Sequence, residues 1–175
     1  MARRPNRAEQ VALDLLDEQK IVAPPVNVER IARQLSVDVR YEPFDGGLSG
    51  ALYRAADNHT VLGVNNWHAD VRQRFTIAHE LGHLLLHPDE LFVDGVLKRD
   101  DESSLAIRSQ EIEANAFAAE LLMPRKLIVD AINRTLATNA TPDPKRLIAD
   151  LAKLFDVSEQ AMEFKLVNLG LAVSV

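Results

Sequence analysis

The residues best suited to chemistry lie in one short segment, His79-Glu80-Leu81-Gly82-His83-Leu84-Leu85-Leu86-His87. His79 and His83 are four positions apart, so on a helix they lie one turn apart on the same face. Two imidazoles placed in this way can bind one metal ion at about 2.0–2.1 Å each. Glu80 projects beside such an ion, where its carboxylate can take a proton from water. The spacing therefore predicts a metal site suited to hydrolysis, with Glu80 as its base.

A catalytic zinc site needs a third protein ligand and an open fourth position. His87 lies about 12 Å from His79 along a straight helix, at ~1.5 Å per residue, which is too far for it to share the ion. It either faces the substrate, supports the site from outside, or is a histidine favoured by the helix dipole. Glu113 is the better candidate, because a carboxylate beside an apolar helix face is costly unless something pairs with it. Without the histidine pair it would be an ordinary helix charge, and Glu111 and Glu120 are expected to face solvent.

The elements that must position these residues follow from the periodicity of apolar residues. Helical spacing predicts helices over residues 8–16, 28–35, 67–87, 109–123, 124–136, 145–155 and 158–169, with Asn6, Asn27 and Ser158 as N-caps. Alternation predicts strands over residues 37–41, 48–54 and 60–64, and their short connections favour antiparallel pairing. Turns are expected at 45–47 and 57–58, a loop at 89–104 and a linker at 138–144. This order predicts an α+β domain followed by a small helical unit.

Composition limits the class of function. The chain has 175 residues, a net charge of −6 and no cysteine, which excludes disulfides, thiolate metal sites and a cysteine nucleophile. An acidic chain is a poor non-specific ligand for nucleic acid or anionic membranes. No apolar run approaches the ~20 residues that span a bilayer. A cytoplasmic protein without membrane partners is therefore expected.

Two segments together resemble the ImmA/IrrE family of metallopeptidases, over about residues 26–136. They are Arg74-Phe75-Thr76-Ile77-Ala78-His79-Glu80-Leu81-Gly82-His83 and Glu113-Ala114-Asn115-x-Phe117-Ala118-x-x-Leu121-Leu122-Met123-Pro124. The resemblance implies Zn²⁺ held by His79, His83 and Glu113, with Glu80 as the catalytic carboxylate. It also implies a zincin-like core with a short, mainly antiparallel sheet and an active-site helix. We accordingly divide the chain into a peptidase domain, 1–137, and a helix-turn-helix-like unit, 138–175.

The resemblance further implies cleavage of a helix-turn-helix repressor, which relieves repression. Zinc would lower the pKa of bound water toward ~7, and Glu80 would pass the proton of that water to the leaving amine. Asn115 or a residue early in the helix would orient a ligand. Residues 48–54 are either an edge strand that binds an extended substrate or a plain sheet strand. The sequence leaves open which side chain stabilises the oxyanion, among Tyr41, Tyr53, His59, His68 and His87.

Two alternatives omit proteolysis. Residues 151–161 have the pattern of a helix-turn-helix, which favours a DNA-binding regulator. The predicted recognition helix, however, carries Glu159 and Glu163 against one Lys165, a poor balance for a phosphate-lined groove. We therefore expect this unit to pack on the catalytic domain or to dock the repressor substrate. A zinc-dependent sensor would keep the metal without the reaction, but such a site has no use for a base at Glu80.

Overall fold

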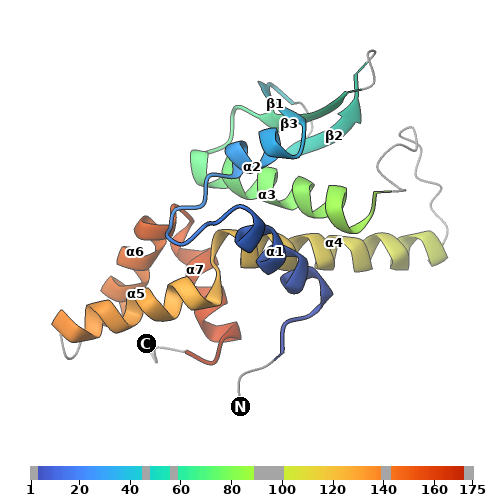
Figure 1. The fold of residues 1–175 in the computed structure, drawn as a ribbon. Coiled ribbons are helices and arrows are strands. Elements are labelled where there is room, and N and C mark those ends of the chain that lie inside the picture. Colours follow the sequence, from blue (N-terminus) through green and yellow to red (C-terminus); the bar gives the residue numbers. More distant parts are fainter. Residues whose placement is uncertain (1–3, 45–47, 56–58, 89–100, 139–142, 172–175) are drawn as a thin grey trace.

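The computed structural model describes residues 4–44, 48–55, 59–88, 101–138 and 143–171. Every helix and strand expected from the sequence is present, and Figure 1 shows their arrangement. The expected turns at 45–47 and 57–58, and most of the loop at 89–104 and of the linker at 138–144, lie outside the described residues. The elements are, in order, α1 (Arg7–Glu18), α2 (Val28–Gln34), β1 (Val37–Glu42), β2 (Gly50–Arg54), β3 (Thr60–Asn65), α3 (Asp70–Leu86), α4 (Asp101–Leu122), α5 (Arg125–Thr138), α6 (Pro144–Phe155) and α7 (Glu159–Asn168).

The helix starts confirm the expected caps. Asn6 and Glu9 form a reciprocal capping box at the start of α1. The Asn27 side chain accepts from the backbone N–H of Arg30, and Ser158 caps α7. The main difference in length is at α4, which begins at Asp101 rather than near residue 109.

The sheet is mixed rather than mainly antiparallel. Its strand order is β1-β3-β2, with β2 antiparallel to β3 and β1 parallel to β3. The expected hairpin between β2 and β3 is confirmed, because a short connection reverses the chain. Val61, Leu62 and Val64 are fully buried, so β3 occupies the centre of the sheet. β1 pairs with the other edge of β3 and runs in the same direction as that strand.

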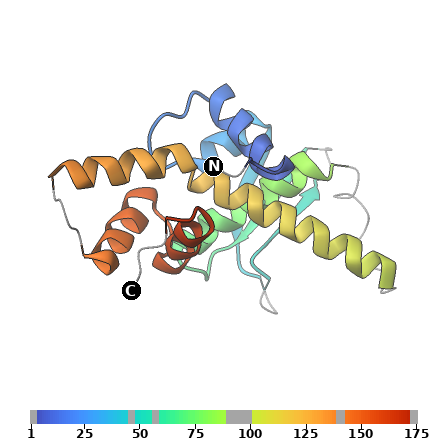
Figure 2. The same ribbon diagram turned by 90° about the horizontal axis from the view of Figure 1, so that it is seen from below.

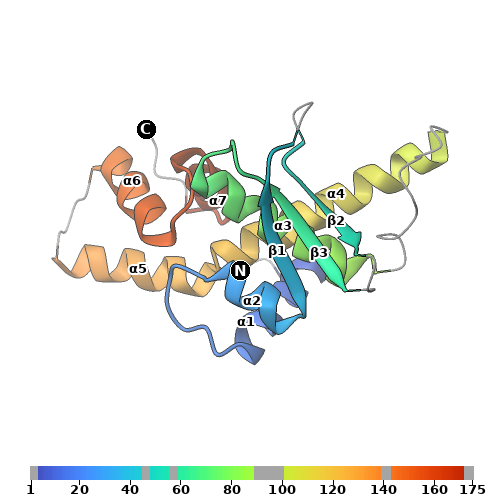
Figure 3. The ribbon, with the colours of Figure 1, turned by 90° about the horizontal axis from the view of Figure 1, so that it is seen from above.

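The fold is layered around α3. In Figure 1 this helix lies between the sheet and α4, and α1 packs on α4. From above, in Figure 3, β1, β3 and β2 lie over α3. Both surfaces of α3 are therefore used for packing, one against strands and one against a helix.

The helices α3 and α4 approach closely at Gly82. A Cβ atom built there would lie 3.1 Å from the Cα of Ala114 and 3.2 Å from its carbonyl oxygen. These neighbours are backbone atoms, which cannot rotate away as a side chain can. Gly82 therefore lets the two helices pack backbone to backbone, with Phe117 filling the space beside it.

The two C-terminal helices join the same core. Figure 2 shows α6 and α7 on one side of the α4–α5 line, with α1 and α2 on the other. Phe155, Met162 and Leu166 belong to one continuous cluster of buried apolar residues with the core of the first domain. The division of the chain at residue 137 remains a prediction. None of the helices within the described ranges is long and apolar enough to cross a membrane.

A substitution at Gly82 tests this packing. We expect Gly82→Val to destabilise the fold by about 1–3 kcal/mol, because its methyl groups overpack the backbone of Ala114. Urea unfolding followed by circular dichroism measures the change. Ala137→Val, at an exposed position of α5, is the control for placing a β-branched residue in a helix and should cost well under 1 kcal/mol. Equal effects of the two substitutions would contradict the backbone contact.

Candidate metal centre

Two imidazoles and one carboxylate converge between α3 and α4. The Nε2 atoms of His79 and His83 lie 3.1 Å apart. The Glu111 carboxylate places Oε2 3.4 Å from the Nε2 of His79 and Oε1 3.2 Å from the Nε2 of His83. Both histidine side chains are largely buried, at 16% and 14% exposure, and Glu111 is half exposed. The group is thus open to solvent on the side of the carboxylate.

These separations fit one tetrahedral metal ion. Two ligand atoms that are each ~2.0–2.1 Å from zinc at a tetrahedral angle lie about 3.3–3.4 Å apart. The two nitrogens are 3.1 Å apart, and each lies 3.2 or 3.4 Å from a different oxygen of Glu111, which is close to that value. Two nitrogens and one oxygen leave a fourth position free, as a catalytic site requires. His79, His83 and Glu111 are the one group of this kind found within the described ranges.

Asn115 prepares His79 for such an ion. Its Oδ1 lies 3.2 Å from the Nδ1 of His79, and an amide oxygen can only accept a hydrogen bond. The proton of the neutral ring is therefore on Nδ1, and the lone pair of Nε2 faces His83 and Glu111. Burial and the neighbouring His79 lower the pKa of His83, which also favours the neutral imidazole.

The structure does not bring Glu113 to the imidazole pair. The Oε2 of Glu113 lies 3.3 Å from the Nε2 of His87 and 3.7 Å from the guanidinium of Arg7. On α4, Ala114 marks the face that touches α3. At about 100° per residue, Glu111 lies ~60° to one side of Ala114 and Glu113 ~100° to the other side. Glu111, expected to face solvent, is therefore the carboxylate beside the histidines.

Glu80 lies beside this group without belonging to it. Burial, together with the charge of Glu111, raises the pKa of the Glu80 carboxyl to about 7. No side chain among the described residues donates a hydrogen bond to this carboxylate. Gly50 of β2 packs close by. A Cβ atom built there would lie 3.9 Å from the Cγ of Glu80 and 2.4 Å from the Cγ2 of Thr76 on α3. Glu80 thus sits where the strand edge meets the metal group.

A cavity of about 820 Å³ is lined by His79, Glu80, Glu111 and Asn115, but not by His83. Arg72, whose guanidinium donates to the Ser49 hydroxyl at 2.9 Å, also lines it. Three residues of α7 lie in the wall as well, and no sequence pattern singled out these individual residues. The lining residues are Leu48, Ser49, Gly50, Val71, Arg72, Phe75, Thr76, His79, Glu80, Glu111, Asn115, Leu122, Met123, Val157, Ser158, Gln160, Ala161 and Phe164.

None of the five side chains considered for the oxyanion lines the described part of this cavity. The Tyr41 hydroxyl donates to Glu29, and the Tyr53 hydroxyl donates to Glu42 at 3.4 Å. His87 faces Glu113 instead. The remaining two, His59 and His68, are likewise absent from the lining.

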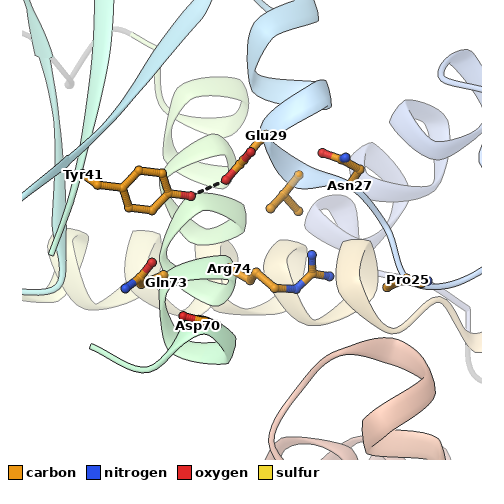
Figure 4. Close-up of a pocket in the computed structure, with 8 residues that line it drawn as sticks. Pro25, Asn27, Glu29, Tyr41, Asp70, Gln73 and Arg74 are labelled. Carbon is orange, nitrogen blue, oxygen red and sulfur yellow. Dashed lines mark hydrogen bonds between the residues drawn. The ribbon is translucent and has the colours of Figure 1, made fainter. Parts of the chain in front are cut away.

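A second cavity, of about 420 Å³, is shown in Figure 4. It lies where α2, β1 and the start of α3 meet, and Glu29, Tyr41 and Arg74 line it. The Arg74 guanidinium is occupied by structural contacts, since it donates to the carbonyls of Val26 at 3.0 Å and Asp156 at 3.1 Å. This cavity is therefore a poor candidate for a reaction site.

Comparison with known proteins identifies a family of peptidases. The sequence profile of the IrrE N-terminal-like domain, a peptidase family, matches residues 32–167, more than three quarters of the chain. The radiation response metalloprotease IrrE of Deinococcus deserti is 40% identical over 101 residues, which are 57% of this chain and 33% of that protein. IrrE of Deinococcus radiodurans is 33% identical over 131 residues, 74% of this chain and 36% of that protein. This chain thus spans about a third of the length of these relatives.

Two more distant proteins are also similar. An uncharacterized immunity region protein 2 of Bacillus phage phi105 is 27% identical over 108 residues, 62% of this chain and 66% of that protein. A Mycobacterium tuberculosis transcriptional regulator shares the fold, with a TM-score of 0.61 and 17% identity over 91% of this chain and 46% of that one. The match over residues 32–167 covers the α3 histidines, Glu80 and Glu111 alike, and the chain therefore belongs to the IrrE N-terminal-like domain family of peptidases.

Proposed function

We propose that this chain is a zinc-dependent peptidase whose metal is held by His79, His83 and Glu111, with Glu80 as the catalytic carboxylate. The observation that carries the proposal is that two imidazole nitrogens and the two oxygens of one carboxylate lie 3.1–3.4 Å apart beside a second, partly buried carboxylate. Family membership and the names of the two IrrE relatives support it. Glu111 replaces Glu113 in this proposal, because Glu113 contacts His87 and Arg7 instead.

Several residues of the chain have separate roles in the proposed hydrolysis. When bound, a zinc ion supplies Lewis acidity that activates water and polarises a carbonyl group. The Glu80 carboxylate takes the proton of the attacking water and returns it to the leaving amine. Asn115 holds the His79 ring in the orientation and tautomer that ligation needs. Arg72 is a cation in the same cavity, and it replaces the tyrosines and histidines as a candidate for stabilising negative charge on the substrate.

The free edge of β2 offers a place for an extended substrate. The backbone N–H of Asn65 donates to Ser49, and that of Ala55 donates to His59, so alternate residues of the strand bond to β3. The N–H groups of Gly50, Leu52 and Arg54 therefore point to the free edge. Because Gly50 also lines the cavity, a peptide added to this edge would run past Glu80.

We propose a helix-turn-helix repressor as the substrate. The phage relative is named as an immunity region protein, and the two Deinococcus relatives are named for a radiation response. Both names connect this domain with regulated responses. A repressor acts on DNA, which would place the reaction in the cytoplasm.

A role in binding DNA receives less support from the structure. On α7, Met162, Lys165 and Leu166 are buried, and Lys165 is paired with Glu120. Gln160, Ala161 and Phe164 line the cavity. The remaining charged positions of the helix include Glu159 and Glu163, which repel phosphate. The alternative of a zinc sensor leaves Glu80 without a role.

The third ligand can be tested with a matched pair of variants. We expect Glu111→Ala to lower zinc affinity more than ~100-fold, since changes to groups that only support ligands already cost about 10–100-fold. Glu113→Ala should stay within a few-fold of the parent protein. Competition with a chromophoric chelator measures both affinities. The opposite order of effects would restore Glu113 as the ligand.

The catalytic role of Glu80 predicts a separation of binding from turnover. Glu80→Gln should keep its zinc but cleave a helix-turn-helix repressor about 10²–10⁴-fold more slowly, because the base is lost. Repressor cleavage on gels and zinc content by mass spectrometry are measured together, and the parent protein with chelator is the control. Undiminished cleavage by Glu80→Gln would exclude this mechanism.

The edge-strand contact predicts an effect of proline at position 52. Leu52→Pro removes an outward N–H without removing a hydrogen bond to β3, so KM for an extended peptide should rise about 2- to 10-fold, the value of one hydrogen bond. Leu52→Val keeps the N–H and is the control. Zinc affinity shows whether the site stays intact. Identical KM values for the two variants would count against strand addition.

A further inference from the structure

One face of α7 forms a wall of the reaction cavity. Gln160, Ala161 and Phe164 lie one turn apart or side by side on this helix, and all three line the cavity that holds Glu80. Phe164 is 62% exposed, so most of its apolar surface is open to a ligand. The buried residues of the helix, Met162 and Leu166, anchor it in the core. The exposed phenyl ring thus faces a site where a ligand can cover it.

Polar contacts fix this wall to both helices that carry the metal ligands. Lys165 of α7 forms a buried ion pair with Glu120 of α4. In the turn between α6 and α7, the backbone carbonyl and the carboxylate of Asp156 accept from Arg74 of α3, at 3.1 and 3.0 Å. Breaking a buried pair by removing one partner is strongly destabilising. The position of Phe164 relative to His79 and Glu111 is therefore held from two sides.

Part of the cavity lining near His79 is apolar. Phe75 lies one turn before His79 on α3, with ring centroids 6.2 Å apart. Met123 at the end of α4 and Val157 before α7 also line this part. Across the cavity, Leu48 is 48% exposed. One helical turn is about 5.4 Å, and an extended peptide rises about 3.3 Å per residue. The apolar region therefore lies within about two peptide residues of the metal group.

We propose that α7 selects the substrate: Phe164, together with Phe75 and Met123, receives a large apolar side chain within two residues of the bond that is cut. This inference rests on the proposed peptidase function and adds a substrate class, peptides with leucine-, methionine- or phenylalanine-like side chains at that position. It gives the C-terminal helical unit a role in recognition of protein rather than of DNA. Burial of the exposed phenyl ring against such a side chain supplies the binding free energy.

Binding can be measured apart from catalysis. The zinc-loaded full chain carrying Glu80→Gln is titrated into fluorescein-labelled decapeptides that differ at one position, which is Leu, Phe, Asp or Lys, and anisotropy is recorded. We expect one position at which Leu and Phe peptides bind about 10-fold or more tightly than Asp and Lys peptides. Adding Phe164→Ala should reduce this preference several-fold. Val167→Ala, a 55% exposed position of the same helix outside the cavity lining, is the matched control and should leave it unchanged.

The outcomes separate this inference from the proposed function. A preference that is equal in the Phe164→Ala and Val167→Ala proteins overturns the role of α7, and so does binding of no peptide or of all peptides alike. A Phe164-dependent preference supports it. If the chain with Glu80 intact then cleaves none of the peptides that it binds, the peptidase proposal fails while the apolar recognition site stands.

Discussion

The backbone contact between α3 and α4 is the constraint on which the rest of the structure depends. Gly82 lies between His79 and His83, and its lack of a side chain lets α4 approach to the backbone of Ala114. Glu111 and Asn115 flank that contact on α4, one turn apart, as the histidines are on α3. A larger residue at position 82 would move one helix and separate all four side chains together. The geometry of the candidate metal centre is therefore set by packing before any ion binds.

Electrostatics explains why the packed site favours a cation. Two imidazole nitrogens and a carboxylate face one another at 3.1–3.4 Å, which places several electron-rich ligand atoms around one small space. Glu80 adds a further acidic group in the same cavity, and its raised pKa shows that this environment disfavours more negative charge. The positive charge of a divalent cation would interact favourably with all of these groups. Such a site is costly in isolation, which fits a functional rather than a structural purpose.

Sequence reasoning succeeded where function depends on local spacing. The pair His79 and His83 is a property of one helix turn, and the periodicity of apolar residues predicted each element that was found. Sequence reasoning did not identify the carboxylate beside the histidines, because its identity depends on how α3 and α4 pack. Glu111 and Glu113 both border the apolar face of α4, and only the position of α3 decides which one meets the histidines. The parallel pairing of β1 was missed for the same reason, because pairing order depends on which strand is buried in the centre.

The C-terminal helices show that a motif pattern and its use can differ. Residues 151–161 have the spacing of a helix-turn-helix, and the α6–α7 pair does form. Yet the face of α7 that would contact DNA is divided between a buried ion pair and the wall of the cavity. The described contacts of this helix are with Glu120, with the apolar core and with the cavity, so its spacing alone does not decide which class of partner it meets.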